Sequence, residues 1–504
     1  MLIRLARADF LQRMRSYQYL MTIAVTLLAG IWFVPSSNAN YTVLIVDGYR
    51  GIYNSAWIGA IFVMLSTTVI SLFGFYVVRG SIERDRRNRV GEIIAATPTS
   101  TFVYLLGKML SHIAVLLSML VVLFADAVAM QLLRGEDRSI HIWQIAEPLA
   151  IMSIPVIAVV AALAVLFDAL PILRGGIGNI AFFFLWVTAL VPRRVPTWLD
   201  PLGMWSLTHQ IARGVPHQLA THHLHSTGFG ATSEKAKLFV WHGFTWTPGF
   251  IAERYAFVLV AIVTVAIAAI FFDRFSSAHR ESGAPRRRTP FAGVSATLAR
   301  ISQPILAVCF RSDFGSIVLA ELRLMLQGLS AWWWIIAAGL WIATLFVPNA
   351  AQSTLLSLAW IWAILIWSQM GTRESANGTE QLIYPTLHPL RRQFLAQWYA
   401  GVLLALALGS GALLHAFASG SLHQAIGPIV GAFFLPTLAL ACGAIAQSPR
   451  LFEVCYLILW YAGPMNHTPS IDYTSTAAGA AFSIATVVLF VAAFSARRLR
   501  LQLM

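Results

Sequence analysis

The stretch that decides the fold is Val103-Tyr-Leu-Leu-Gly-Lys-Met-Leu-Ser-His-Ile-Ala-Val-Leu-Leu-Ser-Met-Leu-Val-Val-Leu-Phe-Ala-Asp-Ala-Val-Ala-Met-Gln-Leu132. Its only charged side chains are Lys108 and Asp126. A helix needs about 20 mostly apolar residues to cross the roughly 30 Å hydrocarbon core of a bilayer. The stretch therefore predicts a membrane-spanning helix.

Eleven further apolar stretches accompany this one along the 504 residues, which are 58% hydrophobic and only 11% charged. A soluble protein of this size carries about 25% charged residues, so a water-soluble fold is excluded. The sequence predicts an all-α polytopic membrane protein with about 12 transmembrane helices. The other expected spans are 18–35, 56–78, 147–169, 177–192, 254–272, 331–348, 354–370, 394–417, 425–447, 452–464 and 475–495.

The charge balance gives the expected orientation. Lys and Arg number 35 against 21 Asp and Glu, a net charge of +14. Most of the basic residues fall in segments that share one side if the N-terminus is cytoplasmic, as the positive-inside rule requires. We expect a multi-pass protein of the inner cell membrane with both termini in the cytoplasm. The cytoplasmic placement of Lys and Arg in a protein of the lipid bilayer explains the positive charge, and no nucleic-acid partner is needed.

The chain reads as a duplication. Leu28-Ala-Gly-Ile-Trp-Phe-Val-Pro35 is similar to Leu340-Trp-Ile-Ala-Thr-Leu-Phe-Val-Pro348, and an amphipathic segment precedes each, 2–17 and 316–329. We expect two parallel six-span repeats, each preceded by an amphipathic interfacial helix. The predicted boundaries are a first half at 1–275 with an outer insertion at about 193–253, a cytoplasmic linker at 276–312 and a second half at 313–504.

A Glu–Pro element follows the second span of each half. It reads Gly91-Glu-Ile-Ile-Ala-Ala-Thr-Pro98 in the first half and Gly378-Thr-Glu-Gln-Leu-Ile-Tyr-Pro385 in the second. A short polar helix with an acidic N-terminus and a proline stop suits a stiff cytoplasmic projection. The alternative is a solvated loop whose Glu and Pro only cap helices.

The stretch Arg79-Gly-Ser-Ile-Glu-Arg-Asp-Arg-Arg-Asn-Arg-Val-Gly-Glu-Ile-Ile-Ala-Ala-Thr-Pro-Thr-Ser100, followed by Tyr104-Leu-Leu-Gly-Lys108, resembles the membrane subunits of ABC exporters. The likeness is to the six-span permease class of drug, polysaccharide and peptide exporters, with two copies fused. The second half departs from the pattern, because Gln397 stands where the first half has Lys108.

The resemblance implies an ABC transporter permease that moves a drug-like, peptide or lipidic substrate. Its ATPase-coupling residues would be Glu92, Thr97 and Pro98 in the first half and Glu380, Tyr384 and Pro385 in the second. The sequence holds no Gly-x-x-x-x-Gly-Lys-Ser/Thr motif. We therefore expect a non-enzymatic chain that binds no cofactor itself, with ATP and Mg on cytoplasmic ABC ATPase subunits, two copies, as partners.

Two ionisable residues occupy matching places in the third and ninth spans. Asp126 follows Lys108 by 18 residues, and His415 follows Gln397 by the same number. Ionisable groups at membrane depth are costly and often functional. They are candidates for the substrate pathway, facing each other across it, and the alternative is water-accessible placement near the interface.

The outer insertion is rich in histidine and includes His217, His222, His223 and His225. Imidazole is a common transition-metal ligand, but this spacing fits no closed tetrahedral site, and no cysteine joins it. A polar and aromatic cap is the preferred interpretation over a metal site. For the whole chain, the alternatives to an ABC permease are a proton-coupled twelve-span facilitator and a membrane-embedded transferase.

Overall fold

The structure is a computed structural model. It describes residues 2–15, 17–36, 41–45, 49–190, 199–214, 227–231, 237–272, 313–327, 329, 331–346, 349–379, 390–466 and 468–503. The chain divides into two compact units, Met1–Gly283 and Ala284–Met504. The predicted linker at 276–312 lies outside the described residues. Each unit is described by itself.

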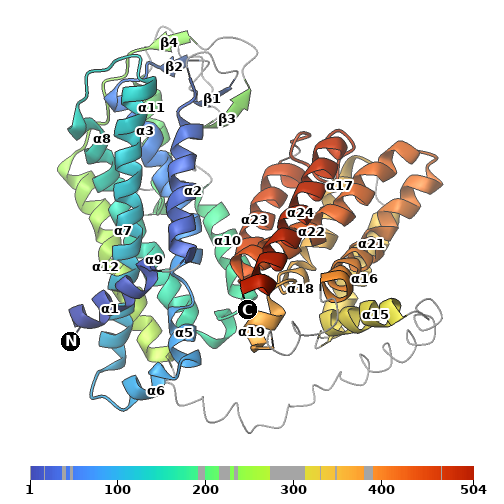
Figure 1. Cartoon of the computed structure of the whole chain (residues 1–504). Coiled ribbons are helices and arrows are strands. Elements are labelled where there is room, and N and C mark those ends of the chain that lie inside the picture. Colours follow the sequence, from blue (N-terminus) through green and yellow to red (C-terminus); the bar gives the residue numbers. More distant parts are fainter. Residues whose placement is uncertain are drawn as a thin grey trace. The chain divides into compact units, whose positions relative to one another are not determined.

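The first unit is a bundle of long helices (Figure 1). Its helices are α1 (Leu2–Met14), α2 (Tyr17–Phe33), α3 (Ser55–Leu65), α4 (Ser71–Val78), α5 (Ser81–Arg87), α6 (Val90–Ala95), α7 (Thr101–Arg134), α8 (Ile142–Pro148), α9 (Ile154–Ala169), α10 (Gly176–Leu190), α11 (Met204–Arg213) and α12 (Pro248–Phe271). A short π-helical segment, Ser66–Ile70, joins α3 to α4, and a second, Leu149–Ser153, joins α8 to α9. We call the two ends of this unit the α6 end and the strand end.

Four short strands cap the strand end (Figure 1). They are β1 (Tyr41–Leu44), β2 (Tyr49–Gly51), β3 (Thr227–Ala231) and β4 (Lys237–Phe239). β1 pairs antiparallel with β3, and β2 pairs parallel with β4. The sequence analysis predicted no strands, because three- to five-residue segments are too short to show an alternating pattern.

An ion pair and an aromatic cluster fix this cap to the helices. Arg50 binds Glu136 at 2.7 Å, and the carboxylate also accepts a hydrogen bond from the Tyr53 amide at 2.9 Å. Burial would raise the pKa of Glu136, but these hydrogen bonds lower it below its ordinary value. The fully buried Trp57 contacts Trp241 edge-on, with ring centroids 5.9 Å apart. Part of the aromatic cap predicted for the outer insertion, Trp241, is therefore buried against the helices.

The second unit repeats the order of a short helix followed by apolar helices. It contains α15 (Asp313–Leu326), α16 (Ala331–Phe346), α17 (Asn349–Ile361), α18 (Ile364–Trp367), α19 (Arg373–Asn377), α21 (Leu395–Ala418), α22 (Ile426–Ala446), α23 (Pro449–Trp460) and α24 (Gly479–Leu503). α22 packs on α21 and α24, as α9 packs on α7 and α12 in the first unit.

Helices form at all twelve apolar stretches that the sequence analysis selected. Among the described residues, seven helices are long and apolar enough to cross a membrane. Two of them leave most of their apolar surface uncovered, since only 22% of the apolar window of α12 and 11% of that of α24 is buried. Such faces are stable against lipid tails and not against water, so the chain is an all-α polytopic membrane protein.

Small residues bring the helices of the first unit close together. Ala158, Ala161 and Ala162 on α9 are buried in one cluster with Ala261 and Ala268 on α12. Small side chains let helix backbones approach in a membrane, where dispersion packing holds helices together. The same cluster contains Ile82 of α5 and Tyr104 of α7. The core thus reaches the α6 end and supports the residues described next.

Candidate functional site

The predicted coupling element of the first unit, 91–98, contains most of α6, and α5 directly precedes α6 at this end of the unit (Figure 1). α5 begins after Gly80, which has φ of 82°, and α6 begins after Arg89, which has φ of 56°. The backbone of both residues is in the left-handed region, so the chain turns sharply at the start of each helix. The sequence predicted a short polar helix within 91–98; the helix found there, α6, is mainly apolar, and the turn at Arg89 was not predicted.

α6 presents an acidic and apolar surface. Glu92 lies in its first turn and is exposed, where the positive end of the helix dipole stabilises a carboxylate. Ile93 is 69% exposed and Val90 is 40% exposed. An exposed isoleucine beside an exposed glutamate, on a helix outside the apolar spans, is a surface that a protein partner can cover.

The residues after α6 fix its orientation towards α7. The Thr97 hydroxyl donates to the Ile94 carbonyl oxygen at 2.7 Å and lies 2.9 Å from the Thr99 hydroxyl. Pro98 is exposed, and Ser100 then caps α7 by accepting from the Val103 amide at 3.3 Å. Thr97 and Pro98 therefore form a short, hydrogen-bonded connection between α6 and the third apolar helix.

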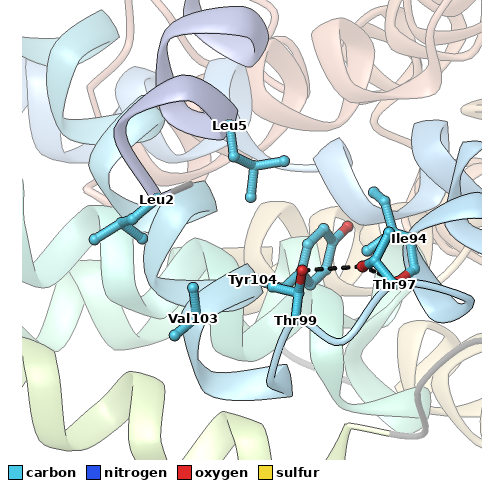
Figure 2. A pocket seen from close by; sticks show the side chains of 7 residues that line it. All are labelled: Leu2, Leu5, Ile94, Thr97, Thr99, Val103 and Tyr104. Carbon is cyan, nitrogen blue, oxygen red and sulfur yellow. Dashed lines mark hydrogen bonds between the residues drawn. The ribbon is translucent and has the colours of Figure 1, made fainter.

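A small apolar pocket joins α6 to α1 and α7. Figure 2 shows Leu2 and Leu5 of α1 with Ile94, Thr97 and Tyr104 around it. Its volume is about 50 Å³, well below the roughly 300–1,000 Å³ of a site for a drug-sized ligand. The pocket is thus too small for such a ligand. Its lining brings Ile94 of α6 near residues of α1 and α7.

A buried ionic cluster lies behind this pocket and centres on Asp9 of α1. The Asp9 carboxylate lies 2.9 Å from Lys108 Nζ and 2.6 Å from an Arg84 nitrogen, and it accepts from the Ser111 hydroxyl at 2.7 Å. Lys108 also lies 2.8 Å from Asp85, which accepts from Tyr104. The cluster therefore joins α1, α5 and α7 through charged groups.

The charges of this cluster compensate one another. Burial alone would raise the pKa of Asp9, but Lys108 and Arg13 lower it well below its ordinary value. Arg13 also donates to the Val77 and Val78 carbonyl oxygens at the end of α4, at 3.0 and 2.7 Å. A cation at a helix C-terminus is favourable. The buried face of α1 is polar, because it contains Asp9 and Arg13.

The second unit has a corresponding pair of ion pairs. Arg373 of α19 binds Glu321 of α15 at 3.2 Å, and Glu374 binds Arg497 of α24 at 3.3 Å. In the first unit, Arg84 binds Asp9 of the leading helix, and Asp85 binds Lys108 of α7, whereas the cation of the second unit lies on its last helix, α24. Both short helices follow a left-handed glycine, Gly80 or Gly371.

The remaining predicted site residues have different outcomes. Glu380, Tyr384 and Pro385 lie outside the described residues, as do His217, His222, His223 and His225. Asp126 packs against Gly30 of α2, and His415 lies 3.1 Å from the Leu345 carbonyl oxygen of α16. Each therefore contacts the first apolar helix of its own unit. In the described part of the chain, no three His, Cys, Asp or Glu side chains are grouped to hold a metal.

Sequence reasoning missed the residues of the Asp9 cluster as a group. Asp9 and Lys108 are 99 positions apart, and no sequence spacing relates them. One signal was available, because a lysine inside an apolar span requires a buried partner. Comparison with known proteins adds no assignment: no protein-family model matches the sequence, and no curated protein matches it significantly.

Proposed function

We propose that the chain is the membrane-spanning permease of an ATP-driven exporter and that a separate ATPase binds at α6. The observation that carries the proposal is the pairing of an exposed surface with a rigid support. Glu92 and Ile93 are open to a partner, while Ile94 of the same helix packs against the buried core and the preceding helix, α5, is held by the Asp9 cluster.

This arrangement suits the transmission of force. A displacement of α6 by a partner reaches α7 because Ile94 and Ala95 pack against the buried cluster that contains Tyr104 and Leu105. Interdigitated side chains transmit a rigid-body movement because packed interfaces do not deform continuously. α7 then carries the movement through the bilayer, since its 34 residues make one unbroken helix.

The two corresponding ion-paired short helices, α5 and α19, support the fused-duplication part of the proposal. An exporter of this kind needs two permease halves and two ATPase subunits. The fused chain supplies both permease halves. The separate ATPase subunits would bind ATP and Mg and hydrolyse the ATP, since this sequence contains no phosphate-binding loop. The substrate that we propose is drug-like, peptide or lipidic.

Charge reversal at α6 tests the proposal. We expect Glu92→Arg to reduce co-purification of an ATP-hydrolysing partner by at least tenfold, because a charge complementary to Glu92 would become repulsive. Glu253→Arg is the matched control, since Glu253 is also exposed but lies at the strand end. Equal ATPase recovery with wild type and Glu92→Arg would contradict the proposal, whereas proton-driven transport without ATP would favour a facilitator.

A further inference from the structure

A carboxyl group that has no partner among the described residues is buried in α7. Asp126 is 6% exposed, and its Oδ2 atom accepts no hydrogen bond. Among the described residues it makes no ion pair. Apolar residues precede and follow it, at 113–125 and 127–130, with Ser118 the only polar one. Asp126 therefore lies within the apolar part of the longest helix.

Another buried carboxyl of the spans shows what a compensated site looks like. Asp168 of α9 is 5% exposed, lies 3.6 Å from Arg79 Nε and accepts from the Gly80 amide at 2.7 Å. An ionised carboxylate without such partners is strongly unfavourable in an apolar environment. Asp126 lacks both a cation and a donor, so its neutral form is the one that this packing accommodates.

Gly30 of α2 limits what can neutralise Asp126. A Cβ atom added at Gly30 would lie 1.5 Å from Asp126 Oδ2, so the carboxyl touches the α2 backbone. On this side no room exists even for a methyl group, and a hydrated or organic cation is larger. We propose that Asp126 is a proton-binding site at the contact between α2 and α7.

The proton controls how tightly α2 is held. Tyr19 and Ser118 are hydrogen-bonded at 2.7 Å on one side of Asp126, and Arg134 donates to the Ile31 carbonyl oxygen at 2.7 Å on the other. Along the contact between α2 and α7, which we call the seam, the Asp126 carboxyl is thus the one unpaired polar group among the described residues. When the proton leaves, the carboxylate requires water, and α2 separates from α7 at Gly30.

The other ionisable groups near α7 lie towards its two ends. Tyr19 and Arg134 are the groups of the seam itself, and both are engaged. Those on the other helices that pack against α7 are Arg4, Arg7, Asp9, Arg13, Tyr76, Glu147, Asp168, Glu253, Arg254 and Tyr255. Of these, Asp9, Arg13 and Asp168 are paired at the α6 end, and Glu253 and Arg254 lie at the strand end.

Reaction with an apolar carbodiimide tests the site in full-length protein in lipid vesicles. A protonated carboxyl adds its O–H across one C=N bond of the reagent, and the product rearranges to a stable N-acylurea without another reactant. We expect dicyclohexylcarbodiimide to label Asp126 and not Asp168, with complete loss of this label in Asp126→Asn. Equal labelling of the two aspartates would overturn the proposal.

Infrared spectroscopy supplies a readout that needs no access by a reagent. Wild type should show the carbonyl stretching band of a protonated carboxyl, and Asp126→Asn should lose it. Absence of that band in folded wild type, together with absence of carbodiimide label, would also overturn the proposal. Neither measurement uses ATP or a partner, so failure here leaves the ATPase proposal standing, and the reverse also holds.

Discussion

Neutralising Asp9 tests whether the buried cluster holds α1 in place. In Asp9→Asn, Lys108 remains 2% exposed and keeps one carboxylate partner, Asp85, at 2.8 Å. Breaking a buried ion pair costs about 3–5 kcal/mol when a charge is left uncompensated. Because Asp85 remains, we expect the lower value, about 3 kcal/mol, which is a roughly 100-fold change in the opening equilibrium of α1.

Hydrogen–deuterium exchange of the protein in vesicles measures this opening directly. Amides of α1 should exchange roughly 100-fold faster in Asp9→Asn than in wild type. Arg4→Ala is the control, since Arg4 is exposed on the same helix. Unchanged exchange of the α1 amides in Asp9→Asn would refute the prediction that the Asp9 cluster holds α1 in place.

Two further predictions concern pH and backbone geometry. Hydrogen bonds from Arg50 and Tyr53 lower the pKa of Glu136, so its stabilisation is present above the ordinary pKa of a glutamate and is lost as pH falls through the lowered pKa. Glu136→Gln should flatten the acid side of a thermal-stability profile, and an unchanged profile would contradict this. Gly371→Ala should destabilise more than Gly378→Ala, by thermal unfolding, because both have positive φ but only the new Cβ at 371 meets α22, 2.9 Å from the Ala444 nitrogen; equal losses would contradict the packing argument.

The helices could be predicted from sequence because the signal is local. An apolar stretch of about 20 residues has few alternatives in a membrane, and each of the twelve stretches contains a helix, although turns interrupt 354–370 after Ile361. The break between α5 and α6 could not be predicted, since it depends on a left-handed Arg89, a conformation that arginine rarely adopts.

The candidate site was predictable only in its exposed part. Glu92, Thr97 and Pro98 stand in a contiguous motif, so composition and order revealed them. Asp9 and Lys108 meet through tertiary packing of α1 on α7, and the orphan state of Asp126 depends on the close approach of Gly30. Such contacts follow from helix packing, for which one sequence carries no register information.

Photocrosslinking from α6 tests the central claim most directly. A photoreactive amino acid is placed at position 93 and, as control, at position 143, where Ile93 and Trp143 are 69% and 70% exposed; Trp143 lies in α8 at the strand end. After irradiation of native membranes, we predict that position 93 captures a protein containing a phosphate-binding loop and that position 143 does not. Absence of such a protein at position 93, or equal capture at both positions, would contradict an ATPase bound at α6.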